Sequence, residues 1–394
     1  MDEADEKRRA ELRKAGQAYF DKVLAQASTG HDPFTPAASK ATISKATDPD
    51  LAAVGSALEQ ALFGISLIIF LACSSTAMVF CKLALTILPA PCTILVLHML
   101  PISLAALIAA NYGLLNSQPP TLKGARSALP YSVFHGGMAL MVLFALEHMR
   151  VETVLGVTAA VAPFVGSYLC NALADPSKPH TELSSSQIAV VVLGFISSVI
   201  CIAAEGPNTM SAAYWLFPWF ALLAMERACD AAKTPGVVVT AESIGWRWRA
   251  RQQILKLLVQ LEGLTPDVED GALPAPGELG TVETLLYCNA LPLLPVAILA
   301  ALLQEGSIFT DLELHVHSVS LLGYSVLASV GAALAGVVLR ERMSSQNFSL
   351  TTILTQLTAL VISIWGRDDV LVVEGLVSSV VCVLAGSAFK DWLQ

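Results

Sequence analysis

Ten long apolar runs constrain the fold of this chain more than any other feature. They lie at residues 61–81, 92–115, 130–148, 151–173, 187–204, 211–229, 281–303, 316–340, 348–366 and 369–389. A helix needs about 20 apolar residues to cross the hydrocarbon layer of a bilayer, and lipid leaves no water to satisfy the backbone of an irregular segment. Since 55% of the residues are hydrophobic and 14% are charged, the sequence predicts an all-α polytopic membrane protein with ten transmembrane helices.

The lysine and arginine residues predict that both chain ends lie in the cytosol. In that orientation 20 of the 23 basic residues fall on the cytosolic side, and only Lys82, Arg150 and Arg367 fall on the other. Without the eight basic residues of the long N-terminal tail, the ratio is still twelve to three. Cytosolic loops carry such an excess.

One sequence pattern occurs twice. GFISSVICIAA at Gly194–Ala204 returns as GLVSSVVCVLA at Gly375–Ala385, in the fifth and tenth predicted spans. ALEHM at Ala145–Met149 is similarly matched by LRERM at Leu339–Met343, at the ends of the third and eighth spans. Five spans per half would insert the second half upside down relative to the first. The pattern therefore predicts two inverted five-helix repeats, residues 59–206 and 207–389, a common plan of secondary transporters.

A second interpretation of the pattern stays open. Small residues at i, i+4 and i+7 also form a face for close helix packing, so the likeness can arise by convergence. In both interpretations these residues are packing residues and not ligands.

The remaining segments carry little chemistry. Residues 1–58 form a predicted cytosolic tail and linker, residues 230–280 a cytosolic insertion in the second repeat, and residues 390–394 the cytosolic C-terminus. The insertion contains a stretch with an apolar face, which is typical either of a helix on the membrane surface or of a tolerated loop. The acidic start argues against a cleaved targeting peptide, so the first span is expected to act as an uncleaved signal.

The sequence also predicts that the protein is not an enzyme. It contains no zinc-protease, nucleophile-elbow or phosphate-loop motif and no paired carboxylates within a span. No metal or other cofactor is expected.

The seventh and ninth spans carry the most informative polar residues. The seventh contains Tyr287 and Asn289 before two prolines, which interrupt helical hydrogen bonding and bend a helix. The ninth carries a row of hydroxyl groups and one amide, with Thr352, Thr355 and Gln356 as the predicted lining of a substrate site. A polar side chain in lipid is costly enough to require such a reason, although helix contacts can absorb some of the hydroxyls.

Two further residues are candidates with an ordinary alternative. Lys82, at the end of the first span, is placed to attract an anionic substrate, or to reach the lipid headgroups with its ammonium group. His135, in the third span, can line a cavity or be a buried, hydrogen-bonded histidine.

At these residues the chain resembles the nucleotide-sugar transporters of the drug/metabolite transporter superfamily, a group related to GDP-mannose and UDP-sugar transporters and triose-phosphate translocators. SSTAMVFCKLAL at Ser74–Leu85 is similar to that family's Ser-rich first span ending in Asn-Lys, with Cys81 in place of Asn. LYCNALPLLPVAILA resembles the Tyr-Asn-Asn pattern of its seventh span, with Cys288 in place of the first Asn. The ninth span lacks the family's lysine.

The resemblance implies a multi-pass antiporter of the Golgi or endoplasmic reticulum membrane. It would exchange cytosolic nucleotide sugar for lumenal nucleoside monophosphate by alternating access, with Tyr287 and Asn289 at the base or ribose, the span-nine residues at the sugar phosphate, and Lys82 guiding entry. Membrane lipids and the small-molecule substrate are the expected partners, a homodimer is compatible with the sequence, and nucleic acid is not expected. Two alternatives remain: a carrier of the same fold for a neutral or weakly charged metabolite, which the missing lysine favours, and a non-transporting membrane scaffold or trafficking factor.

Overall fold

The computed structural model of the protein is helical, and no strand occurs among the residues that it describes. These residues are 49–112, 120–174, 184–206, 213–233, 280–308, 316–343, 345–365 and 373–391, together with 250, 253, 254 and 256. The chain divides into two compact units, residues 1–62 and 63–394. The described part of the first unit is the beginning of one helix, and the architecture below is that of the second. The predicted N-terminal tail and most of the 230–280 insertion lie outside the described residues.

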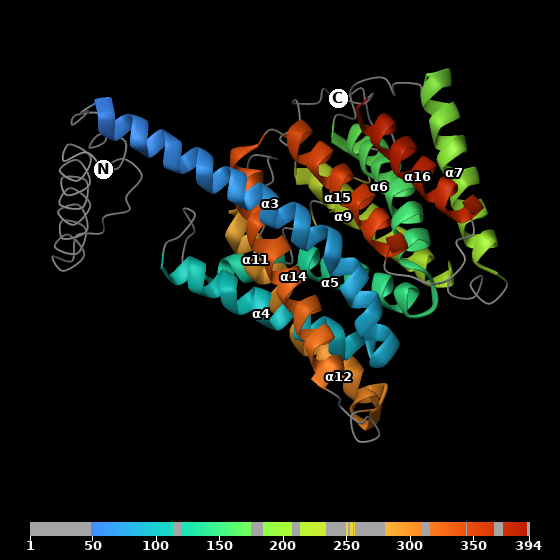
Figure 1. Ribbon diagram of the computed structural model, residues 1–394, viewed down its shortest axis with the longest axis horizontal. Helices are drawn as coiled ribbons and strands as arrows, with labels where there is room; N and C mark the ends of the chain where they lie inside the picture. The colour runs from blue at the N-terminus through green and yellow to red at the C-terminus, as the bar shows by residue number, and fades with distance from the viewer. Residues whose placement is uncertain are drawn as a thin grey trace, which may run out of the picture. The chain divides into compact units, whose positions relative to one another are not determined.

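The helices follow the predicted apolar runs closely (Figure 1). Their bounds are α3 Pro49–Ile87, α4 Pro91–Asn111, α5 Leu122–His148, α6 Val151–Ala174, α7 Ser185–Glu205, α9 Leu216–Lys233, α11 Thr281–Ala290, α12 Leu293–Leu302, α14 Val316–Arg342, α15 Ser345–Trp365 and α16 Val373–Asp391, with short 3₁₀ turns η2 Ala213–Trp215 and η5 Glu305–Ser307. Within the described residues the predicted runs lie on helix except at Tyr112, at Leu303 and at the break that divides the seventh run between α11 and α12.

Six helices of the described part are long and apolar enough to cross a membrane. They are Gln60–Ile87, Pro91–Asn111, Leu122–His148, Ser185–Glu205, Thr281–Leu302 and Val319–Arg342. Shorter apolar stretches occur at Val151–Ala162, Leu350–Ile364 and Val377–Gly386. By length and composition the chain is therefore a multi-pass membrane protein, and the prediction of an all-helical polytopic chain is confirmed at that level.

Local sequence explains where several helices begin and break. The Thr121 hydroxyl accepts the Gly124 N–H at 3.1 Å at the start of α5, and Ser184 and Gln187 form a reciprocal capping box at the start of α7. The predicted interruption of the seventh span is confirmed, because α11 ends at Ala290 and α12 begins at Leu293, on either side of Pro292. Proline lacks the N–H that would continue the helical hydrogen bonding.

The helices run between two ends of the bundle. We call the turn end the one at which residues 88–90 join α3 to α4 and residues 149–150 join α5 to α6. The opposite end, at which Thr121 precedes α5 and Arg342 ends α14, is called the loop end. In the predicted topology the turn end is lumenal and the loop end cytosolic.

The best-buried apolar core lies at the turn end. The side chains of Leu146, Met149 and Val154 there are fully buried by neighbouring helices, as is Ile94 near the start of α4. In lipid, such packing is driven by close van der Waals contact more than by removal of apolar surface from water. The α5–α6 hairpin is thereby held in one orientation.

The packing of helices joins the two halves of the chain. Helix α16 packs against both α6 and α7, and α4 packs against α11, α12 and α14 (Figure 1). Helix α5 contacts α9 and α11, and α15 contacts α6 and α16. Helices from residues 207–389 thus pack mainly against helices from residues 59–206.

The two copies of the repeated pattern contact each other through matching residues. Ser198 Oγ lies 3.6 Å from Cys382 Sγ, and Ser379 Oγ lies 3.3 Å from Cys201 Sγ. Each thiol also approaches the glycine carbonyl of the other copy, Cys201 that of Gly375 at 3.6 Å and Cys382 that of Gly194 at 3.7 Å.

The two copies match in two further respects. Each second serine donates to its own glycine carbonyl at 2.8 Å. A Cβ on Gly194 would lie 3.7 Å from Ala385 Cβ, and one on Gly375 would lie 3.5 Å from Ala204 Cβ. Residue i of one copy contacts residue j of the other, and j contacts i, which is the signature of a local twofold relation. The repeated residues are packing residues, as predicted.

Candidate functional site

Tyr287 and Asn289 are buried on α11, just before the break in the seventh span. The Tyr287 hydroxyl accepts the Thr121 N–H at 2.7 Å and donates to the Thr121 carbonyl at 2.9 Å. The Asn289 amide donates to Leu285 O, one turn earlier, at 2.8 Å. Tyr287 thus attaches α11 to the start of α5 at the loop end. In this arrangement both side chains form hydrogen bonds with backbone groups of the protein.

The polar row of the ninth span faces the bundle more than its surroundings. Thr355 is buried, Thr352 and Gln356 are half-buried, and the exposed face of α15 carries Leu350 and Leu354 instead. The threonine hydroxyls donate to carbonyls of their own helix, Thr352 to Phe348 at 2.9 Å and Thr355 to Thr352 at 2.6 Å. Gln356 makes no hydrogen bond with another described residue, so its amide is the group of this row that is most available to a ligand.

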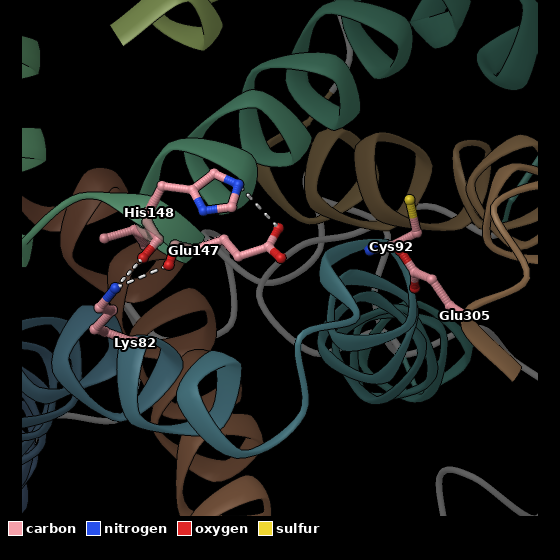
Figure 2. Close-up of polar contacts among 6 residues, drawn as sticks. Lys82, Cys92, Glu147, His148 and Glu305 are labelled. Atoms are coloured by element: carbon pink, nitrogen blue, oxygen red, sulfur yellow. Dashed lines mark hydrogen bonds and ion pairs between the residues drawn. The ribbon is translucent and has the colours of Figure 1, made fainter. Parts of the chain in front are cut away.

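Lys82 lies at the turn end and bonds to the C-terminus of α5 (Figure 2). Its Nζ donates to Leu146 O at 2.6 Å and to Glu147 O at 3.2 Å. The last carbonyls of a helix lack partners in the helix and carry partial negative charge, so an ammonium group there is favourable. In this arrangement Lys82 holds α3 against α5.

Glu305 supplies the complementary contact at the start of α4 (Figure 2). One carboxylate oxygen accepts the Cys92 N–H at 3.1 Å, and the other accepts the Thr93 N–H at 2.7 Å and the Thr93 hydroxyl at 2.8 Å. Ala90, which precedes the helix, has no side chain that could cap it. A residue more than 200 positions later in the chain therefore performs the N-cap function.

A similar contact occurs at the start of α6. Glu205, the last residue of α7, accepts the Arg150 N–H with one carboxylate oxygen. Nearby, Ser363 of α15 donates to Glu152 at 2.6 Å. Charges at the turn end are thus placed on helix ends of opposite partial charge, and we call the set formed by Lys82, Glu205 and Glu305 the turn-end contacts.

A second polar group, in the interior, joins three helices. His98 Nε2 of α4 lies 2.9 Å from Ser325 Oγ of α14, and the Cys81 thiol of α3 lies close to the same hydroxyl. All three residues are buried. Cys81 and Lys82, neighbours in the motif of the first span, therefore fix α3 to two different helices.

His135 lies in a different environment, near the middle of α5. Its side chain is exposed, although the next two residues of α5 are closely packed: a Cβ on Gly136 would lie 2.7 Å from Pro292 Cβ, and one on Gly137 would lie 2.8 Å from Leu222 Cδ1. It is close enough to Arg340 of α14 for their charges to interact. Exposure beside close packing is compatible with the predicted lining role of His135.

Arg340 forms the centre of a basic group at the loop end. Its guanidinium lies 5.1 Å from the centroid of the Phe348 ring, which is the geometry of a cation–π contact. Its charge also interacts with those of Arg227 and Glu226 on α9. Since Phe348 is one turn before Thr352, the loop-end cluster of Arg340, Arg227 and Phe348 lies next to the start of the predicted polar row.

The structure places the predicted site residues at different depths. Lys82 belongs to the turn end and Tyr287 to the loop end. His135 is linked to the span-nine row through Arg340, which contacts Phe348. Arg340, Arg227 and Glu305 were not predicted. Two arginines in the last turns of apolar runs were a signal, but the same pattern is common at membrane interfaces.

The chain matches no model of a known protein family, and it matches no curated protein. Function has to be argued from the fold and from these polar groups.

Proposed function

We propose that the protein is a secondary transporter built from two inverted five-helix repeats. It exchanges cytosolic nucleotide sugar for lumenal nucleoside monophosphate across a Golgi or endoplasmic reticulum membrane. Both chain ends are cytosolic, and substrate binds between the halves, where the predicted polar residues of α11 and α15 lie.

The observation that carries this proposal is the reciprocal contact between α7 and α16. Four contacts occur as two exchanged pairs, Ser198–Cys382 with Ser379–Cys201 and Cys201–Gly375 with Cys382–Gly194. The pairs show that α7 and α16 run antiparallel and pack through the same face. A local twofold axis between the fifth and tenth spans is what two inverted repeats require.

Two other observations support the same relation. Contacts join the equivalent helices of the proposed halves, α4 with α11 and α12, and α6 with α15. The matched motifs ALEHM and LRERM also end alike: the Met149 N–H donates to Ala145 O at 2.8 Å, and the Met343 N–H donates to Leu339 O at 2.8 Å. Ala145 and Leu339 are both fully buried.

Counterflow into proteoliposomes tests the proposal directly. Vesicles preloaded with uridine or guanosine monophosphate are given a panel of radiolabelled nucleotide sugars outside, with empty vesicles as the control. We expect uptake of one sugar nucleotide that depends on the preloaded monophosphate. Folded protein that exchanges no member of the panel would overturn this function, and uptake of an uncharged metabolite would replace it by the neutral-carrier alternative.

Gln356 provides the sharpest variant for this assay. We expect Gln356→Leu to abolish exchange while leaving the unfolding temperature nearly unchanged, because the amide has no hydrogen-bond partner among the described residues. Thr358→Val is the matched control, since the Thr358 hydroxyl donates to Leu354 O of the same helix at 2.8 Å and should be dispensable. An equal loss of folded protein in Gln356→Leu would show that the residue is structural.

A further inference from the structure

The Arg340 guanidinium is stacked on an aromatic ring. The Phe348 ring lies below it at 5.1 Å, and Phe70 of α3 lies against that ring, with centroids 5.6 Å apart. The side chain of Arg340 is exposed, and it forms no ion pair within the part of the chain that the structure describes. An aromatic face fixes the plane of a guanidinium and leaves the N–H groups at its edge available.

The surroundings of Arg340 favour an anion at this place. Arg227 brings a second positive charge and Glu226 one negative charge. Two like charges near each other repel, and a bound anion reduces that repulsion. The loop-end cluster has an excess of positive charge although it lies at the end of apolar helices.

We propose that Arg340, with Arg227, forms a binding site for a phosphoryl anion at the loop end. The planar fork of N–H groups in arginine matches two oxygens of a phosphate. Two sources can supply that group. One is the phosphate of a transported nucleotide, and for this source the inference rests on the proposed function. The other source with the same chemistry is the headgroup of an anionic lipid.

A binding experiment on the full-length protein distinguishes the sources. The probes are uridine monophosphate, guanosine monophosphate and inorganic phosphate, added to protein in nanodiscs of phosphatidylcholine, and nanodiscs in which a third of the lipid is phosphatidylserine. Thermal stabilisation and equilibrium binding are both measured. Arg340→Gln is compared with Arg342→Gln, which removes the same charge from an exposed residue of the same helical turn.

If the anion is a nucleotide phosphate, the wild type and Arg342→Gln bind a monophosphate, and Arg340→Gln binds it about 10- to 100-fold more weakly, as expected for the loss of charge-assisted hydrogen bonds. If the anion is a lipid headgroup, Arg340→Gln loses the stabilisation by phosphatidylserine instead. Arg340→Lys should recover only part of either effect, because a lysine keeps the charge and loses the fork.

The proposal is overturned if Arg340→Gln, with an unchanged unfolding temperature in the absence of ligand, binds every probe and phosphatidylserine as the wild type does. If Arg340→Gln fails to fold, Arg227→Gln takes its place and must show the same weakening. Binding of phosphate at Arg340 without any counterflow would refute the proposed transport and leave the anion site intact. Counterflow that survives Arg340→Gln unchanged, with unchanged binding, would refute the anion site alone.

Discussion

Removal of the Glu305 carboxylate should destabilise the fold more than removal of any exposed acid. The first-turn donors of α4 can be accounted for one by one. Pro91 has no N–H, the Cys92 and Thr93 N–H groups donate to Glu305 at 3.1 and 2.7 Å, and the Ile94 N–H already donates to Ala90 O at 3.0 Å. Glu305 is only 4% exposed. Water therefore cannot readily replace the carboxylate.

The magnitude follows from that count. Each buried N–H left without an acceptor costs about 1–3 kcal/mol, so Glu305→Ala should lower the free energy of unfolding by about 2–6 kcal/mol. Glu305→Gln keeps one acceptor oxygen and loses the charge at the helix N-terminus, for which about half of that loss is expected.

Unfolding by titration with SDS in mixed micelles, followed by circular dichroism, measures these differences. The matched control is Glu283→Ala. Glu283 is half-buried and accepts the Gly280 N–H at 3.0 Å in an exposed hydrogen bond at the start of α11, so the loss of that bond should cost about 1 kcal/mol. Equal effects of the two alanine variants, or an effect of Glu305→Ala below about 1 kcal/mol, would refute the argument that a distant buried carboxylate caps α4.

Two further outcomes are expected. Lys82→Met should lower the free energy of unfolding by about 1–3 kcal/mol, since two carbonyls at the end of α5 lose a charged donor; a higher KM for exchange at unchanged stability would instead support the predicted guiding role. In a variant that keeps only Cys201 and Cys382, which lie on the facing surfaces of α7 and α16, copper-phenanthroline should join the halves. A protease site inserted in residues 234–280 allows the chain to be cut into two fragments. These fragments should stay together on a non-reducing gel and separate on reduction. In a control variant that keeps only Cys201 and Cys288, the fragments should separate in both cases.

The sequence predicted helix positions well where lipid determines them, and less well where it does not. The predicted run at 187–204 differs little from α7, Ser185–Glu205, because a capping box begins the helix at its apolar edge. The run at 130–148 misses the first turns of α5, which begins at Leu122 after the Thr121 cap and continues through Pro130. An apolar run detects the part of a helix that contacts lipid, whereas a helix continues for as long as its backbone is satisfied.

The polar contacts were predictable only in part. The inward orientation of the span-nine row followed from its composition, and Thr355 is indeed buried. The partners of Lys82 and Glu305 did not follow, since both bind backbone groups at helix ends, which no side-chain pattern marks. The contact between Glu305 and Thr93 also joins residues 212 positions apart, and only the packed bundle places them together.

If exchange proceeds by rocking of one half against the other, substitutions at the turn end and the loop end should have different effects from substitutions at the α7–α16 contact. Residues on a rotation axis move least, so the serine–cysteine contacts near the local twofold axis can persist throughout a cycle. Contacts far from the axis have to break and form again. The turn-end contacts bind charges to helix ends, and the loop-end cluster leaves Arg340 with no ion pair among the described residues. Substitutions along α7 and α16 should therefore change stability first, and substitutions at Lys82, Glu305 or Arg340 should also change the rate of exchange.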